Sequence, residues 1–176
     1  MNKKLRLLVA DKCNRNCPKC CNKLYDLDKL PIVTNYDQYD EIIFTGGEPM
    51  LNPDFLMGVI DGARTIRPGA TLYLQTAKVD EYYKAAQVLD RLNGMTVTLH
   101  ESADINHLVM FNKFIPDSFR RDKSLRVSVS SKMIKESWWD YKKLNHLQGW
   151  EIKFFEFEDE CPVPEGEDFK RIKCLM

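Results

Sequence analysis

LRLLVADKCNRNCPKC, residues 5–20, begins with an apolar, strand-like run and ends in three closely spaced cysteines. A second strand-like run opens residues 41–49, EIIFTGGEP, and leads directly into a glycine-rich turn. A [4Fe–4S] cluster normally takes four thiolates, so Cys13, Cys17 and Cys20 alone would leave one iron without a protein ligand. An open metal position is where a metal site does chemistry. The two segments therefore predict a reactive metal site at the ends of two strands.

The cysteine loop and the glycine turn together resemble the radical S-adenosylmethionine superfamily. In that family a Cys-x3-Cys-x2-Cys loop holds a [4Fe–4S] cluster whose unique iron is chelated by the amino and carboxylate groups of S-adenosylmethionine. An electron from the cluster then breaks the sulfur–C5′ bond, and the resulting 5′-deoxyadenosyl radical abstracts hydrogen from a substrate. The resemblance covers residues 7–14 and 44–49 and makes the three cysteines the cluster ligands. One departure is Lys19, because the family commonly has an aromatic residue before the third cysteine.

The resemblance also implies which residues hold S-adenosylmethionine. The turn Gly46, Gly47, Glu48 and Pro49 corresponds to the family element that binds the methionyl amino group. Glycines allow close approach of the backbone to a ligand, and the Glu48 carboxylate is able to pair with an ammonium group. Contacts to the carboxylate, ribose or adenine are expected from later strand ends, at Gln75, Thr76, His100, Ser128, Ser130 and Phe157. An ordinary loop or strand-end role is the alternative for each of them.

Strand-like segments alternate with helix-like segments along the chain. The strands are expected at residues 5–10, 41–44, 71–75, 95–99, 125–129 and 150–157, and the later helices at 79–92, 103–114 and 133–147. This alternation predicts an α/β fold with a parallel sheet and right-handed crossovers. Six units match the partial (β/α)6 TIM-like barrel that the resemblance implies. Binding sites of such barrels lie at the carboxyl ends of the strands, where both motifs fall.

The first helix has a clear start. Asn52 is the expected N-cap before Pro53, and Phe55, Val59, Ala63 and Ile66 are expected to face the core, up to the stop at Pro68-Gly69. We expect a single compact domain: residues 1–158 form the radical S-adenosylmethionine core, and residues 159–176 form an irregular tail.

Composition excludes several broad classes. The 176 residues are 44% apolar and balance 26 Lys and Arg against 26 Asp and Glu, so the net charge indicates neither general nucleic-acid binding nor membrane binding. No apolar stretch is long enough to span a bilayer, and the amino-terminal run is too short for a secretory signal. A cytoplasmic location is therefore expected, with cysteines that act as ligands or free thiols.

Three other cysteines fall outside the expected cluster loop. Cys21, Cys161 and Cys174 are expected to be free thiols, with ligation of a second cluster as the alternative. For Cys13, Cys17 and Cys20 the alternative is a zinc site whose fourth ligand is Cys21, a histidine or a distant cysteine.

The sequence thus predicts a minimal radical S-adenosylmethionine enzyme with a [4Fe–4S] cluster and S-adenosylmethionine as cofactors. Its partners would be an electron donor of the flavodoxin or ferredoxin type and a small-molecule, peptide or protein substrate. Asn22, two residues after the last ligand, is similar to small activases that install glycyl radicals on partner enzymes, although their glycine-rich stretch is missing. The alternatives are an enzyme of the 7-carboxy-7-deazaguanine synthase type and a non-catalytic iron–sulfur or zinc protein.

Overall fold

The fold is an α/β structure built on one parallel sheet. The computed structural model describes residues 3–17, 20–130, 142–156 and 163–175. Its strands are β1 (Lys4–Ala10), β2 (Glu41–Gly46), β3 (Thr71–Thr76), β4 (Gly94–Leu99), β5 (Ser124–Ser130), β6 (Trp150–Phe155) and β7 (Glu167–Arg171). All six strands expected from the sequence are present, and all pairings between the described strands are parallel.

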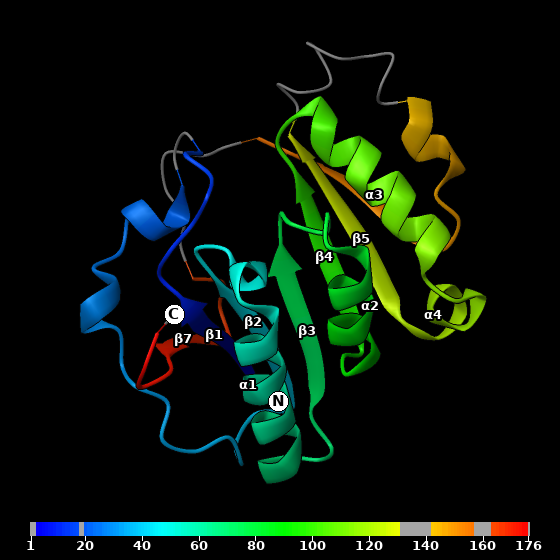
Figure 1. The fold of residues 1–176 in the computed structure, drawn as a ribbon. Coiled ribbons are helices and arrows are strands. Elements are labelled where there is room, and N and C mark those ends of the chain that lie inside the picture. The colour runs from blue at the N-terminus through cyan, green and yellow to red at the C-terminus, as the bar shows by residue number, and fades with distance from the viewer. Residues whose placement is uncertain (1–2, 18–19, 131–141, 157–162, 176) are drawn as a thin grey trace.

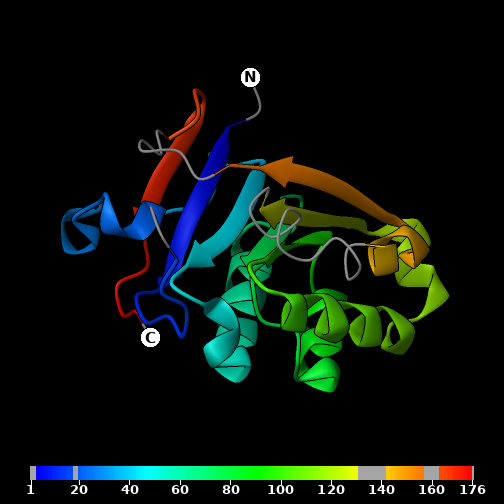
Figure 2. The same cartoon turned by 90° about the horizontal axis from the view of Figure 1, so that it is seen from above.

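The strand order is β6-β5-β4-β3-β2-β1-β7, so the first six strands lie side by side in chain order. Right-handed crossovers that always advance in one direction leave their helices on one face of the sheet. Figures 1 and 2 show α1 (Pro53–Ile66), α2 (Tyr82–Asp90) and α3 (Ser102–Phe114) on that face, and the short α4 (Asp117–Asp122) precedes β5. The sheet is not closed, since β6 and β7 form its two edges.

Alternating side chains divide the sheet into a core face and a second face. Leu5, Leu7 and Val9 of β1 belong to the main core with the helices, and they are fully buried. Register places Leu7 beside Phe44 of β2, which continues the same apolar row. The second face carries mostly polar or half-buried side chains. Among the described residues, α1, α2 and α3 cover one face of the sheet, which agrees with this alternation.

Helix α1 starts where the sequence predicts, but it turns a different face inward. The Asn52 side chain accepts a hydrogen bond from the Phe55 amide at 3.1 Å, which caps the helix. The buried side chains are Pro53, Leu56, Ile60 and Ala63. Of the expected inner residues, Ala63 is buried, Phe55 and Val59 are half-buried and pack against the core, and only Ile66, at 53% exposed, is wrong. Both stripes have helical spacing, so periodicity alone does not choose between them.

The remaining helices differ from expectation in their limits. Helix α2 is shorter than residues 79–92, α3 matches 103–114 within one residue, and α4 was not expected. Of the helix expected at 133–147, residues 133–141 lie outside the described residues, and Lys142–His146 is a 3₁₀ helix. Among the described residues, no helix has both the length and the apolar character that a membrane span requires.

The segment expected to be an irregular tail contributes strand β7. Glu167–Arg171 pairs in parallel with β1, and this corrects the expectation for residues 159–176. The strand carries one apolar residue, Phe169, so it lacks the apolar alternation of a typical strand. Polar pairs hold it instead: Arg6 bonds Glu167 at 3.0 Å, and the Tyr39 hydroxyl donates to Asp168 at 2.5 Å.

Candidate metal and cofactor site

The glycine turn holds the chain that leads into the cysteine loop. The amide of Gly47 donates to the carbonyl of Ala10 at 2.7 Å, and the amide of Glu48 donates to the carbonyl of Lys12 at 2.8 Å. These bonds extend the β1–β2 pairing beyond the strand ends as far as the residue before Cys13. The two motifs recognised in the sequence are therefore in direct contact at the carboxyl edge of the sheet.

Both glycines are required by this close approach of backbones. A Cβ atom at Gly46 would lie 2.2 Å from the Ala10 carbonyl oxygen, and Gly46 has a φ of 146° that favours glycine. A Cβ atom at Gly47 would lie 2.1 Å from the Lys12 carbonyl oxygen. The absence of side chains at Gly46 and Gly47 makes room for the backbone of the protein's own cysteine loop.

Glu48 is buried and ties the turn to the next strand. One carboxylate oxygen accepts hydrogen bonds from the Met50 amide at 2.9 Å and from the Thr76 hydroxyl. The other oxygen accepts from the Ala77 amide at 2.7 Å. Burial raises the pKa of the Glu48 carboxyl, and these hydrogen bonds act against that rise. Pro49, also buried, begins the 3₁₀ helix Pro49–Leu51.

The three cysteines of the loop lie in one neighbourhood. Cys13 is exposed, Cys17 and Cys20 are half-buried, and all three are free thiols. Burial raises the pKa of the Cys13 and Cys17 thiols, and the charges of the neighbouring cysteines raise it further. The Arg15 amide donates to the Cys13 sulfur at 3.3 Å. As they stand, the described residues hold no group of three ligating side chains already gathered for a metal.

His100, directly after β4, faces the cysteine loop. Both of its ring nitrogens lie 3.7 Å from the Cys17 sulfur, within reach of a hydrogen bond to sulfur. Burial lowers the pKa of the imidazole, although the charge of Asp104 opposes this. The structure thus brings a second type of metal ligand, an imidazole, next to the Cys17 thiol.

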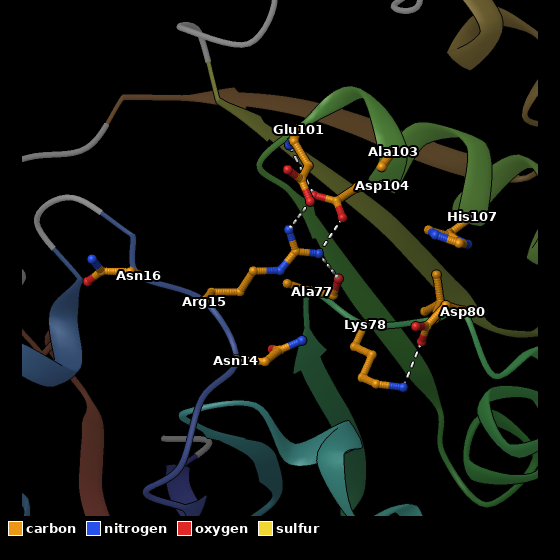
Figure 3. Close-up of a pocket in the computed structure, with 11 residues that line it drawn as sticks. Asn14, Arg15, Asn16, Ala77, Lys78, Asp80, Glu101, Ala103, Asp104 and His107 are labelled. Carbon is orange, nitrogen blue, oxygen red and sulfur yellow. Dashed lines mark hydrogen bonds and ion pairs between the residues drawn. The ribbon is translucent and has the colours of Figure 1, made fainter.

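Arg15 crosses from the cysteine loop to the start of α3 (Figure 3). Its guanidinium donates to Asp104, to Glu101 at 2.9 Å and to the Ala77 carbonyl at 3.4 Å. Burial alone would lower the pKa of Arg15, but Asp104 and Glu101 raise it. A polar pocket of about 400 Å³ adjoins this contact, between the loop, the end of β3 and α3.

The structure separates some of the other predicted residues. Gln75 accepts a hydrogen bond from the Thr45 hydroxyl at 3.4 Å and is half-buried, whereas Thr76 is buried against Glu48. Consecutive strand residues point to opposite faces, so these two side chains leave β3 on opposite faces of the sheet. Ser128 pairs with Thr98 of β4 in the register of the sheet.

The last predicted residues are described only in part or not at all. Ser130 is the final residue of β5, in register with Phe155, while Phe157 and Cys161 lie outside the described residues. Cys21 begins the short 3₁₀ helix Cys21–Lys23, and Cys174 is an exposed free thiol.

The sequence interpretation missed Arg15 and Asp104 as parts of the site. One signal was present: Asp104 stands three residues after Glu101 at a helix start, the spacing of a capping box. Nothing in the sequence indicates that Arg15, 89 residues earlier, would bind that cap.

Comparisons with known proteins add no assignment. No model of a known protein family matches the chain, and no curated protein matches it.

Proposed function

We propose that the protein is a minimal radical S-adenosylmethionine enzyme. The observation that carries the proposal is the pair of backbone hydrogen bonds from Gly47 and Glu48 to Ala10 and Lys12. They join a three-cysteine loop to a Gly-Gly-Glu-Pro turn at the carboxyl edge of a parallel sheet, where α/β folds bind their ligands. A structural zinc site has no need of such a turn.

The open sheet agrees with a partial barrel. Six parallel strands follow one another in chain order with helices on one face, and we propose that they form a (β/α)6 half-barrel to which β7 is added as an extra edge. The second face of the sheet, with Gln75 and Ser128, would then line the interior of the half-barrel.

In this proposal Cys13, Cys17 and Cys20 hold a [4Fe–4S] cluster, and their thiols lose their protons on binding it. When bound, the cluster and S-adenosylmethionine would supply an electron and a 5′-deoxyadenosyl radical that removes hydrogen from the substrate. Gln75, His100, Ser128 and Ser130 are proposed to contact the rest of S-adenosylmethionine.

Glu48 serves two purposes in the proposal. An ionised carboxylate offers about four acceptor positions, and the Met50, Thr76 and Ala77 donors use three. One position remains for the amino group of S-adenosylmethionine, while the other three fix the turn. The carboxylate would then be held in place before the cofactor arrives, which lowers the entropic cost of binding.

The substrate is proposed to be a peptide or a partner protein, as in glycyl-radical activases, because the open sheet leaves one side of the half-barrel uncovered in the part of the chain that the structure describes. A small molecule, as in enzymes of the 7-carboxy-7-deazaguanine synthase type, is the alternative. The electron donor would be a flavodoxin or ferredoxin.

One observation favours a second candidate, a closed Cys3His metal site without catalysis. The imidazole of His100 lies 3.7 Å from the Cys17 sulfur, and three thiolates with one histidine are a common zinc ligand set. A closed site would leave no metal position for S-adenosylmethionine.

Anaerobic reconstitution with iron and sulfide separates the two candidates. The radical enzyme should take up about four irons and four sulfides per chain. Cys13→Ala, Cys17→Ala and Cys20→Ala should abolish the broad visible absorption, whereas the exposed Cys174→Ala is the matched control and should keep it. His100→Ala should still assemble a cluster. One bound zinc, lost in His100→Ala, would instead identify the closed site.

A further inference from the structure

The Arg15 side chain, between the first two cysteines, attaches the cysteine loop to the core. Arg15 is the second residue after Cys13, and its side chain is only 19% exposed. Its guanidinium reaches three acceptors that belong to two different strand ends: Ala77 after β3, and Glu101 and Asp104 at the start of α3. A planar guanidinium with several donors suits such a multidentate contact.

Asp104 is fixed independently of the loop. Its side chain is 3% exposed, and one of its oxygens accepts the backbone amides of His100 at 2.8 Å and Glu101 at 3.0 Å. These bonds cap α3 and leave the other oxygen for Arg15. The buried carboxylate is thus a rigid anchor whose remaining charge is compensated by a residue of the cysteine loop.

The backbone amide of Arg15 contacts the first cysteine of the loop. Its amide donates to the Cys13 sulfur at 3.3 Å, so the residue that is anchored on Asp104 also orients the first thiol. The same anchor carries His100, whose ring lies beside the Cys17 sulfur. Asp104 is therefore connected to two of the three thiols, to Cys13 through Arg15 and to Cys17 through His100.

We propose that Arg15 is a positioning residue: by clamping the cysteine loop to Asp104, it orders the Cys13 and Cys17 thiols for metal binding. The proposal rests on the proposed function only in taking Cys13, Cys17 and Cys20 as metal ligands, and it does not depend on which metal group they hold. Residues that orient metal ligands typically change metal affinity 10- to 100-fold when replaced, roughly the effect expected here.

Cobalt(II) titration of the anaerobic apoprotein tests the clamp, because thiolate-to-cobalt absorption reports cysteine ligation directly. Arg15→Met keeps the apolar stem and removes the guanidinium, and it should weaken cobalt binding roughly 10- to 100-fold. Arg15→Lys should recover part of the affinity, since an ammonium pairs with Asp104 but does not form the planar fork.

Two further variants separate positioning from stability. Arg64→Met is the matched control, because the Arg64 guanidinium also reaches three acceptors, the carbonyls of Pro68 and Ala70 and the side chain of Asn93, at the opposite end of the sheet. It should lower the melting temperature without changing cobalt affinity. The double variant Arg15→Met/Asp104→Asn leaves no unpaired buried charge, and it should fold while still binding cobalt as weakly as Arg15→Met.

The results that would overturn the clamp differ from those that would overturn the proposed function. Wild-type cobalt affinity in Arg15→Met would overturn the clamp and leave the proposed function untouched. An equal loss of affinity in Arg64→Met would also overturn it, because the effect would then follow stability. Absence of thiolate-to-cobalt absorption in the wild-type protein would overturn the ligand assignment itself, and with it both the proposed function and the clamp.

Discussion

Gly47 lies against the backbone of Lys12. The side chain of any other residue at this position would overlap that backbone. The carboxylate of the neighbouring Glu48 accepts three hydrogen bonds from other groups of the protein. At the scale of single residues, the Gly-Gly-Glu-Pro turn therefore holds the cysteine loop in position. Its stability and its proposed ligand contacts depend on the same few atoms, and substitutions there should affect both.

Replacing Gly47 by alanine should displace the loop, because the new methyl group would lie 2.1 Å from the Lys12 carbonyl oxygen. Overpacking of this kind costs about 1–3 kcal/mol of unfolding free energy. Gly62→Ala in α1 is the matched control, since a methyl group there meets nothing within 4 Å. That control should be neutral or stabilise by up to about 1 kcal/mol. Urea unfolding of the apoproteins measures both, and equal stability of the two variants would disprove the close contact.

Glu48→Gln should lower both stability and cofactor affinity. An amide group offers fewer acceptor positions than a carboxylate, so one of the three donors loses its partner, at a cost of about 1–3 kcal/mol. Loss of a charge-assisted bond to the amino group should weaken S-adenosylmethionine binding by roughly one to two orders of magnitude while the cluster still assembles. Anaerobic titration with S-adenosylmethionine and urea unfolding give the two values.

The matched control for Glu48 is Glu41→Gln at the start of β2, the strand before the turn, where the carboxylate pairs with Lys4 at 3.2 Å near the surface. It should change neither value strongly, because surface ion pairs contribute about 0–1 kcal/mol. Wild-type cofactor affinity in Glu48→Gln would show that the carboxylate only holds the turn.

At the scale of elements, β7 shows how a strand forms without an apolar pattern. It lies beside β1 and is held by backbone pairing and by polar side chains from other elements, among them Arg6 and Tyr39. Asp168 is the centre of this group, since it receives the Tyr39 hydroxyl and pairs with Lys3 at 3.2 Å.

The pKa of Asp168 is lowered, mainly by the hydrogen bond from Tyr39 and further by the charges of Lys3 and Lys170. Its contribution to stability is therefore complete above the ordinary value of 3.8 and is lost as the pH falls through the lower pKa of the folded state. Asp168→Asn should be less stable than wild type at neutral pH, and the difference should shrink in acid. Urea unfolding between pH 7 and pH 2 measures it.

Asp37→Asn, in the exposed loop before β2, is the control for the acid series. A stability difference for Asp168→Asn that persists unchanged in strong acid would show that the loss is steric and not electrostatic.

Elements were predictable where the pattern is local. The first six strands follow from apolar runs such as the one in β1, and the start of α1 follows from Asn52 and Pro53, whose effects reach only a few residues. The buried face of α1 did not follow, because two stripes one residue apart have the same periodicity and only packing against the sheet selects Leu56 and Ile60.

At the scale of the whole molecule, the contacts that the sequence does not predict join residues far apart in the chain. The cysteine spacing and the glycine turn identify the candidate site locally, and chain alternation places them at one sheet edge. The contact between Arg15 and Asp104 joins residues 89 apart, and the β7–β1 pairing joins the two ends of the chain. Such contacts leave no periodic signal in one sequence.

The central claim is that three thiolates leave one metal position open for S-adenosylmethionine. The most direct test is to incubate the reconstituted, dithionite-reduced protein with S-adenosylmethionine and to quantify 5′-deoxyadenosine. Slow formation of 5′-deoxyadenosine without substrate is expected in the wild-type protein and not in Cys17→Ala, together with a change in the electron paramagnetic resonance spectrum of the reduced cluster. A protein that holds about four irons and four sulfides, yet forms no 5′-deoxyadenosine and keeps an unchanged spectrum, would contradict the claim.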